Sequence, residues 1–378
     1  MTEISKPSLG PQGRMPKRLV VLFSQLSDYM LSCLGHLRQA KGWEVMVVAW
    51  RPSPAAPYDF ESFARVGKVL IKQDHSADQL HQAVINFQPD ALLLAGWLDQ
   101  DYLRTAGELR KRGVPVVAGC DTQWRGTFRQ RVACVLSPWY LKKRIDVLWV
   151  AGDRQRKFAR RLGYHGPWCW IGYYSCNWPL FAQSPETLAP PAPTAAFLFA
   201  GRYVAEKGIT DLLAAYREYR TCVTYPWKLV CAGAGEYGSL LREQEGVQEF
   251  GFLQPKDLAD LMKCGNHVLV LPSRYEPWGV VIHEAAAAGL ALICSDACGA
   301  AVHLLQDGFN GYLSERGNVR HLLECLVRMH ELPNAARAEM GAKSYDLSQQ
   351  FTPAHWAETL VAGLAQAAWR DAPALPKH

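Results

Sequence analysis

Short apolar runs separated by longer amphipathic stretches recur along most of the chain. In the first half, the runs occupy residues 19–23, 45–50, 90–97, 114–119 and 146–152. In the second half, they occupy residues 195–201, 227–233, 267–273 and 290–296. Apolar runs that alternate with helix-length segments are typical of a parallel sheet covered by helices on both faces. The pattern therefore predicts an α/β protein with two doubly wound, Rossmann-like domains.

Composition marks the expected domain boundaries, and no sequence repeat relates the two halves. We expect a flexible lead-in rich in Pro, Gly and Ser, an N-terminal domain, a Pro-rich linker, a C-terminal domain and a last helix opened by Pro353 that returns to the N-terminal domain. The corresponding residues are 1–17, 18–178, 179–194, 195–350 and 351–372. Two such domains that face each other across a cleft would suit a transfer reaction between two substrates.

Length and composition narrow the class of protein. The chain has 378 residues, of which 49% are hydrophobic, and no apolar run approaches the roughly 18 residues of a membrane-spanning helix. Its 11 cysteines contain no CxxC pair, which favours reduced thiols over a disulfide framework or a zinc site. We therefore expect a folded cytoplasmic protein without a bound metal.

Positive charge is concentrated in the first half. Residues 1–180 hold 25 Lys/Arg and 14 Asp/Glu, whereas the remainder hold 16 and 21. The basic residues gather in segments 125–144 and 154–161, with aromatic residues among them. This pattern predicts either an anionic partner, such as a membrane surface, a phosphorylated acceptor or nucleic acid, or only a solvated helix face. No nucleic-acid-binding motif supports the nucleic-acid alternative.

Residues 271–290 are the most informative segment of the second half. A strand leads into a loop that contains Glu276 and Pro277, and an Ala-rich helix with Glu284 follows. The loop is expected at the carboxyl end of a parallel strand and at a helix N-terminus, where anions bind. Glu276 would lie beside free backbone N–H groups. A carboxylate buried at 284 would need donors such as ribose hydroxyls, or a neighbour in the core.

A second loop, residues 201–208, follows the first strand of the second domain. Gly201 and Gly208 permit the turn, while Arg202 and Lys207 offer a forked guanidinium and a compact ammonium to the same crevice. The pair suits a diphosphate, although two exposed basic residues in an ordinary loop fit the same pattern. The dipeptide at 283–284 begins like an HExxH zinc motif, but Ala287 breaks it.

Five segments together resemble the donor domain of family 4 retaining glycosyltransferases of the GT-B fold, also called glycosyl transferases group 1. They are residues 201–208, 229–238, 250–262, 272–296 and 307–313. The resemblance implies a retaining enzyme that binds a nucleotide-sugar through its C-terminal domain and needs no metal or other cofactor. It also implies attack from the front face, with the acceptor proton passing to the departing phosphate.

The resemblance assigns roles residue by residue. Arg202, Lys207 and Glu276 would be the catalytic residues: the two cations would hold the diphosphate, and Glu276 the sugar. Glu284 would bind ribose. The remaining donor-binding residues would be Gly201, Gly233, Pro277, Trp278, Gly279 and Val280.

The N-terminal domain matches this family only in style. Segment 24–30 lacks the usual glycine-rich loop, and segment 118–126 has Cys120 or Asp121 where many relatives have His. Acceptor-side candidates are Asp121, Trp124, Arg125 and Asp99, with plain loop packing as the alternative.

The expected function is a retaining, metal-independent transfer of a sugar to a glycan or lipid-linked acceptor, in bacterial surface-polysaccharide or glycolipid biosynthesis. The basic N-terminal domain adds a peripheral contact with the anionic inner face of the membrane. Two alternatives stay open: a non-catalytic nucleotide-sugar-binding protein and a GT-B nucleotide-sugar epimerase. A dehydrogenase is disfavoured because no GxGxxG follows the first strand.

Overall fold

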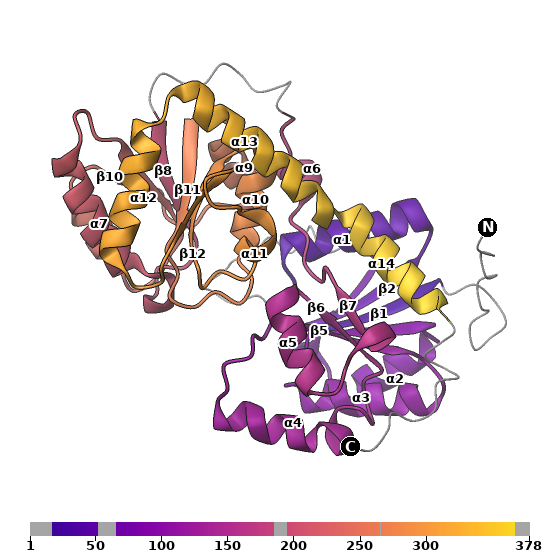
Figure 1. Ribbon diagram of the computed structural model, residues 1–378. Helices are drawn as coiled ribbons and strands as arrows, with labels where there is room; N and C mark the ends of the chain where they lie inside the picture. The colour runs from indigo at the N-terminus through magenta and orange to yellow at the C-terminus, as the bar shows by residue number, and fades with distance from the viewer. Residues whose placement is uncertain (1–16, 52–65, 185–194, 265, 367–378) are drawn as a thin grey trace, which may run out of the picture. The chain divides into compact units, whose positions relative to one another are not determined.

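The computed structural model describes residues 17–51, 66–184, 195–264 and 266–366. These residues form two compact units (Figure 1). The first unit contains the described residues up to Tyr174 together with those from Pro353 onward. The second unit extends from Ser175 to Thr352.

The first unit is built on a parallel sheet with the strand order β3-β2-β1-β4-β5-β6-β7. The strands are β1 (Arg18–Phe23), β2 (Glu44–Ala49), β3 (Lys68–Ile71), β4 (Ala91–Leu94), β5 (Val116–Cys120), β6 (Val147–Val150) and β7 (Cys169–Ile171). The helices are α1 (Asp28–Lys41), α2 (Ala77–Asn86), α3 (Gln100–Lys111), α4 (Phe128–Tyr140), α5 (Asp153–Arg161) and α14 (Pro353–Ala365), with short 3-10 turns at Lys72–Asp74 and Gly166–Trp168.

Two apolar cores cover the two faces of this sheet. Along β1, Leu19 and Val21 belong to the core on one face, whereas Val20 and Leu22 belong to the core on the other. Such alternation follows from the twofold period of a strand. A strand segment that is buried on both faces is apolar at every position, and this is why residues 19–23 of β1 could be recognised in the sequence.

The C-terminal helix α14 is part of the first unit and packs against α1. The ring of Trp356 stacks on Trp149 with centroids 4.8 Å apart, and its Nε1 donates to the carbonyl oxygen of Tyr173 at 3.0 Å. The helix ends at Ala365, and residues 367–372 of the expected helix lie outside the described residues.

The second unit is built on a parallel sheet with the strand order β10-β9-β8-β11-β12-β13. The strands are β8 (Ala195–Ala200), β9 (Lys228–Ala232), β10 (Val247–Glu249), β11 (Asn266–Leu271), β12 (Ala291–Ser295) and β13 (Gly311–Ser314). The helices are α6 (Trp178–Phe181), α7 (Ile209–Cys222), α8 (Gly238–Glu243), α9 (Pro255–Cys264), α10 (Val280–Ala287), α11 (Ala301–Leu304), α12 (Val319–Glu331) and α13 (Asn334–Ser348), with 3-10 turns at Ala205–Lys207 and Gln349–Phe351. The strand order reverses between the neighbouring strands β8 and β11, so the topological switch point lies at the carboxyl ends of these two strands.

Two doubly wound α/β units are therefore confirmed, and their facing arrangement across a cleft stays a prediction. The first unit ends at Tyr174 rather than at residue 178. Residues 175–178 belong to the second unit, because the backbone N–H of Cys176 donates to His283 at 2.9 Å and α6 begins at Trp178. Residues 185–194 of the expected linker lie outside the described residues. None of the described helices combines the length and the apolar character that a membrane crossing requires.

Candidate functional site

Two oppositely charged side chains meet at the switch point of the second unit. Lys207 lies in the loop after β8, and Glu276 lies in the loop between β11 and α10. The Nζ atom of Lys207 forms an ion pair with Oε2 of Glu276. Their side chains are only 15% and 7% exposed. A pair so little hydrated holds both side chains firmly, because neither charge can be left alone without a large desolvation cost.

Backbone contacts join the two loops that carry this pair. The N–H groups of Arg274 and Tyr275 donate to the carbonyl oxygen of Glu206 at 2.8 and 3.2 Å. Arg274 also forms two 2.7 Å hydrogen bonds to the carboxylate of Asp211 at the start of α7. The loops after β8 and β11 are therefore held in register with each other.

The loop that contains Glu276 leads into α10 through Gly279, whose backbone packs closely against the Glu276 side chain. Gly279 caps α10 with φ of 93°, and a Cβ at this position would lie 3.0 Å from Cγ of Glu276. Trp278 is buried, with its ring 5.5 Å from that of Phe351. The side chain of Trp278 therefore belongs to the core, and what residues 278–280 can offer an anion at the start of α10 is their backbone N–H groups.

A third loop, residues 233–237 after β9, packs against the loop after β8. The N–H of Tyr203 donates to the carbonyl oxygen of Ala234 at 2.8 Å. A Cβ on Gly233 would lie 1.9 Å from the carbonyl oxygen of Gly201. Loop packing by itself therefore accounts for a glycine at 233, the residue that the resemblance assigned to donor binding.

Arg202 differs from Lys207 in its surroundings. It is exposed, and within the described residues its guanidinium has no ion-pair partner, whereas Lys207 is paired with Glu276. The resemblance assigned Lys207 and Glu276 to different parts of a donor, the diphosphate and the sugar. The structure brings the two side chains into direct contact, so a donor would meet a preformed pair and one exposed guanidinium.

The expectation of a buried carboxylate at 284 is wrong. Glu284 is half-buried, and the fully buried polar side chain of α10 is its neighbour His283. His283 Nδ1 accepts from the N–H of Cys176, and Nε2 lies 2.9 Å from the carbonyl oxygen of Ser348. Because a carbonyl can only accept, Nε2 carries the proton. Burial lowers the pKa of His283 to about 4.

In the first unit, three of the acceptor-side candidates follow β5. Asp121 accepts a 3.1 Å hydrogen bond from the hydroxyl of Tyr174, and burial raises the pKa of its carboxyl. The ring of Trp124 lies under the guanidinium of Arg161, 4.6 Å from its centroid. Arg125 is exposed. The segment after β5 thus contains a half-buried carboxyl (Asp121), an aromatic ring (Trp124) and an exposed cation (Arg125).

Asp99 has a different setting, in the loop after β4. Its carboxylate accepts from the backbone N–H of Asp101 at 3.0 Å as the N-cap of α3, and it pairs with Lys72 at 2.6 Å. Trp50 Nε1 donates to it as well, at 3.1 Å. These contacts favour a structural role for Asp99 over contact with an acceptor.

Within the residues that the structure describes, no group of three or more His, Cys, Asp or Glu side chains is arranged to hold a metal ion. The switch point instead offers charged side chains, a helix N-terminus and close backbone approaches, which together suit a phosphorylated ligand.

Residues 182–346 match the family model described as Glycosyl transferases group 1. The chain carries a group 1 glycosyltransferase domain. This domain contains Arg202, Lys207, Gly233, Glu276 and Glu284, so every residue assigned to the donor lies in it, whereas the acceptor-side candidates lie outside.

Curated relatives agree with the family match over part of their length. A glycogen synthase from Mycobacterium tuberculosis (strain H37Rv) is 30% identical over 188 residues, which are 48% of this chain and 43% of the relative. An uncharacterized glycosyltransferase from Methanocaldococcus jannaschii is 35% identical over 121 residues, 30% of each chain. The chain thus aligns with less than half of the length of these curated relatives.

Solved structures match the fold of nearly the whole chain. HepE from Anabaena, in complex with UDP and glucose, has a TM-score of 0.70 at 17% identity and covers 92% of this chain and 99% of its own. Sucrose-phosphate synthase from Thermosynechococcus elongatus has a TM-score of 0.70 at 16% identity and covers 91% and 97%. These likenesses establish the GT-B fold that the sequence motifs predicted.

Proposed function

We propose that the protein is a retaining, metal-independent glycosyltransferase that moves a sugar from a nucleotide-sugar to a glycan or lipid-linked acceptor. We place this reaction in the cytoplasm, in the synthesis of a surface polysaccharide or glycolipid. The observation that carries the proposal is the Lys207–Glu276 ion pair at the switch point of a group 1 glycosyltransferase domain.

Each charged group of the site has a place in such a reaction. The ammonium of Lys207 and the exposed guanidinium of Arg202 would stabilise the negative charge that grows on the departing diphosphate. The Glu276 carboxylate would accept hydrogen bonds from sugar hydroxyls, and its contact with Lys207 would hold the two side chains that bind the sugar and the diphosphate next to each other. Half-buried Glu284 would reach the ribose.

The bond changes balance without a covalent enzyme intermediate. The acceptor hydroxyl oxygen bonds to the anomeric carbon on the face from which the diphosphate departs, the bond from that carbon to the phosphate oxygen breaks, and the hydroxyl proton passes to that oxygen. The protein positions the reactants and stabilises the developing charge. Losing one well-placed hydrogen-bond donor to that charge typically costs about 3 kcal/mol of transition-state stabilisation.

A uridine nucleotide is the first donor to test. The HepE structures are described as complexes with UDP, glucose and UDP-glucose. A trehalose-6-phosphate protein from E. coli is described as bound with UDP-2-fluoro glucose. We include UDP-glucose in the proposal on the strength of that shared ligand and of the fold.

Thermal shift and product analysis with UDP-, GDP- and ADP-glucose test the proposal. We expect one donor to raise the melting temperature of the wild-type protein, with EDTA present, and Glu276→Ala to reduce the shift. Transfer to a glycan or lipid-linked acceptor should retain the anomeric configuration, which NMR of the product reports. If no donor stabilises the protein, the donor site is wrongly assigned. Binding without transfer to any acceptor would favour the non-catalytic alternative, and a donor converted to its epimer would favour the epimerase.

A further inference from the structure

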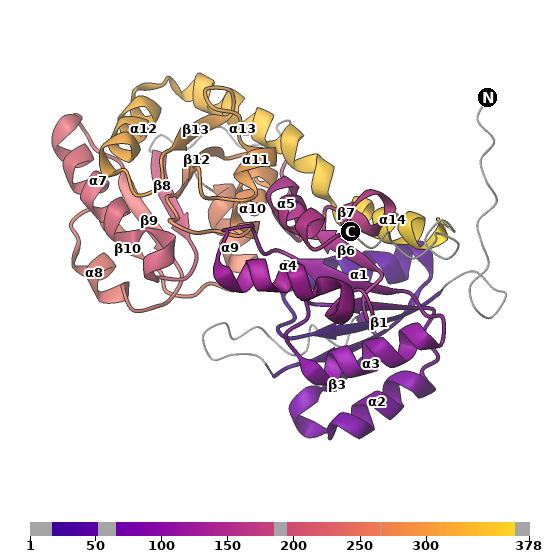
Figure 2. The ribbon, with the colours of Figure 1, turned by 60° about the horizontal axis from the view of Figure 1, so that its bottom comes forward.

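Helix α4 of the first unit exposes a continuous row of large apolar side chains. Phe128 is 82% exposed, Val135 66% and Trp139 62%, and Val132 and Leu136 are exposed as well. Figures 1 and 2 show the helix at the edge of the first unit, beyond α5. We call these five side chains the apolar stripe.

Helical geometry places the stripe on one face. The five residues follow the spacing i, i+4, i+7, i+8 and i+11, which aligns side chains along one side of an α-helix. The opposite side attaches the helix to the unit: Ser137 is its one buried residue, and its hydroxyl donates to the carbonyl oxygen of Leu162 at 2.7 Å. The usual burial of an amphipathic helix is therefore inverted, because the apolar face is in water.

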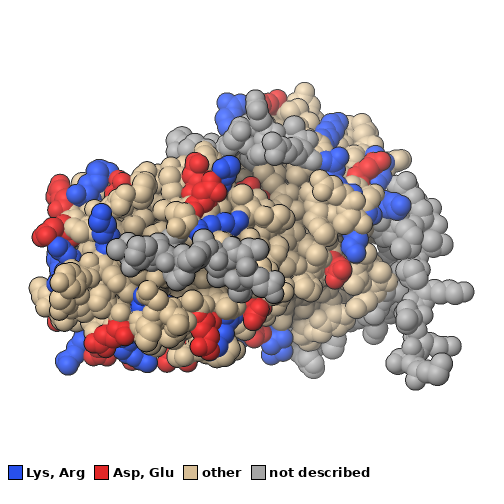
Figure 3. Space-filling view, turned by 90° about the horizontal axis from the view of Figure 1, so that it is seen from above, with Lys and Arg blue, Asp and Glu red and all other residues tan. Residues whose placement is uncertain are grey.

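Basic side chains flank the apolar stripe. Arg129 and Arg131 are exposed on α4, and Lys143 is exposed just after its C-terminus. No acidic residue occurs between Asp121 and Asp146. By contrast, blue and red side chains are interspersed over the face of the molecule in Figure 3.

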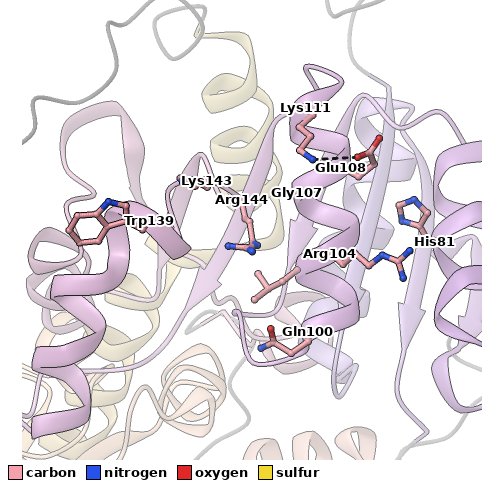
Figure 4. A pocket seen from close by; sticks show the side chains of 10 residues that line it. His81, Gln100, Arg104, Gly107, Glu108, Lys111, Trp139, Lys143 and Arg144 are labelled. Carbon is pink, nitrogen blue, oxygen red and sulfur yellow. Dashed lines mark ion pairs between the residues drawn. The ribbon is translucent and has the colours of Figure 1, made fainter.

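A cavity of about 720 Å³ adjoins the end of the apolar stripe. Trp139 belongs to both, and four basic side chains contribute to the lining of the cavity: Arg104, Lys111, Lys143 and Arg144. Figure 4 shows Trp139 on one wall and Arg104 and Glu108 on α3 opposite, with Arg144 between them. We call this cavity the basic groove.

Two carboxylates offset part of the positive charge of the basic groove: Glu108, which lines it, and Asp78, which pairs with Arg104 at 3.0 Å. Glu108 is shared between Arg112, at 3.2 Å, and Lys111, at 4.0 Å. Lys143 has no ion-pair partner within the described residues, and the guanidinium of Arg144 lies over the ring of Tyr140 rather than on a carboxylate. The basic groove thus keeps a net positive charge next to an exposed aromatic ring.

We propose that α4 and the basic groove dock the protein on the surface of an anionic lipid bilayer. The apolar stripe enters the boundary between headgroups and acyl chains, and the flanking cations and the basic groove bind lipid phosphates. The aliphatic members of the stripe decide for a bilayer over nucleic acid, because Val132, Val135 and Leu136 gain burial in lipid and have no stacking role on bases. This proposal goes beyond the transfer reaction, since docking needs no bound donor.

Sedimentation with vesicles tests the docking surface. The probes are vesicles of phosphatidylcholine alone and of phosphatidylcholine mixed with phosphatidylglycerol. We expect the full chain to bind the anionic vesicles at least about tenfold more tightly, and Phe128→Ser/Trp139→Ser to lose about tenfold of that affinity. Arg129→Glu/Lys143→Glu should also lose binding, and the remainder should depend less on salt.

Matched controls separate the surface from general effects. Tyr225→Ser removes an aromatic side chain that is 88% exposed in the second unit, and Arg320→Glu reverses a charge whose side chain is 90% exposed there. Both controls should bind vesicles like the wild type. All the substituted side chains are exposed, so unchanged melting curves should accompany the loss of binding.

Four outcomes would overturn the docking proposal. Wild-type protein that ignores anionic vesicles would do so, and so would stripe variants that bind as the controls do. A dimer in analytical ultracentrifugation that the stripe variant abolishes would assign the helix to a second copy of the chain. Tight binding of single-stranded nucleic acid without vesicle binding would assign the charge to another partner. None of these outcomes bears on donor binding, which the thermal shift measures separately.

Discussion

At the scale of single residues, the Lys207–Glu276 pair joins stability to the proposed chemistry. Sixty-nine positions separate the two residues, and they meet only because β8 and β11 are neighbours at the switch point. Removing one partner leaves a nearly buried charge without its counter-charge. Substitutions here therefore have to be measured in both stability and turnover.

We expect Lys207→Met to lower the free energy of unfolding by about 3 kcal/mol, because it leaves Glu276 buried and unpaired. Lys207→Met/Glu276→Gln should recover most of that loss, since both charges are gone. Sugar transfer should stay about 100-fold or more below wild type in both variants, because the leaving group has lost its cation. Urea unfolding and product formation measure the two effects. Recovery of transfer along with stability in the double variant would show that the pair is only structural.

His283 predicts a pH dependence of stability. Its pKa is about 4 in the folded protein against 6.5 for an ordinary His, so protons bind preferentially to the unfolded chain between these values. The contribution of neutral His283 to the free energy of unfolding is therefore complete above pH 6.5 and is lost as the pH falls toward 4. By pH 5 this loss is on the order of 2 kcal/mol. Urea unfolding at pH 7.5 and 5 should show a steeper loss for wild type than for His283→Gln. Equal losses would contradict a neutral, buried His283.

At residue scale, the positions of the charged side chains were easier to predict than the partners that they contact. The positions of Arg202, Lys207 and Glu276 in loops after strands followed from local pattern, because a strand, a glycine and a helix are adjacent in sequence. The ion pair and the burial of His283 rather than Glu284 depend on which side of α10 meets Cys176 and Ser348. The His283–Glu284 dipeptide was the signal in the sequence that could have identified the buried His283. A His beside a Glu on an apolar helix can be a core residue held by two backbone groups as well as a metal ligand.

At the scale of elements, close packing of loops limits what the site tolerates. The loops after β8 and β9 approach each other at Gly201 and Gly233, and a Cβ on Gly233 would strike the main-chain carbonyl of Gly201, which cannot rotate away. The glycines of this region thus position the segment that carries Arg202.

We expect Gly233→Ala to destabilise the protein by about 2 to 4 kcal/mol and to weaken the donor-induced thermal shift, because the added Cβ pushes the two loops apart. Gly317→Ala is the control: it also has positive φ, of 70°, but a Cβ there meets nothing within 4 Å. It should cost about 1 kcal/mol and leave the donor shift unchanged. The same donor shift in both variants would mean that loop packing does not position the site.

Central elements were predicted well and edge elements poorly. The buried positions of β1, β8 and β11 form unbroken apolar runs, at residues 19–23, 195–200 and 268–271, so these runs stood out in the sequence. The edge strand β10 consists of Val-Gln-Glu without a buried residue, and β3 at the other sheet's edge has none either. Because an edge strand is less covered by helices than a central strand, it needs fewer apolar residues. The hydrophobic pattern of the sequence therefore gives little indication of where an edge strand lies.

At the scale of the whole molecule, the described residues pass from one unit to the other after Tyr174 and after Thr352. Composition pointed to the Pro-rich segment 179–194 as the boundary, yet contacts place the first passage earlier. Cys176 and Ser348 both bind His283 in the second unit, while Trp356 binds the backbone of Tyr173 in the first. Hydrogen bonds at the ends of the passages, rather than proline content, therefore define the units.

Donor binding should protect the units unequally. If the second unit holds the nucleotide-sugar, hydrogen exchange with saturating UDP-glucose should slow most in the loops after β8, β9 and β11, at residues 201–208, 233–237 and 272–279. The Lys207→Met/Glu276→Gln variant at the same donor concentration is the control, and it should show weaker protection in these loops. Segment 121–125 of the first unit should respond more to an acceptor than to the donor. Protection that appears first in segment 121–125, with no change in the three loops, would move the donor to the first unit and remove the basis for assigning Arg202 and Lys207 to the leaving group.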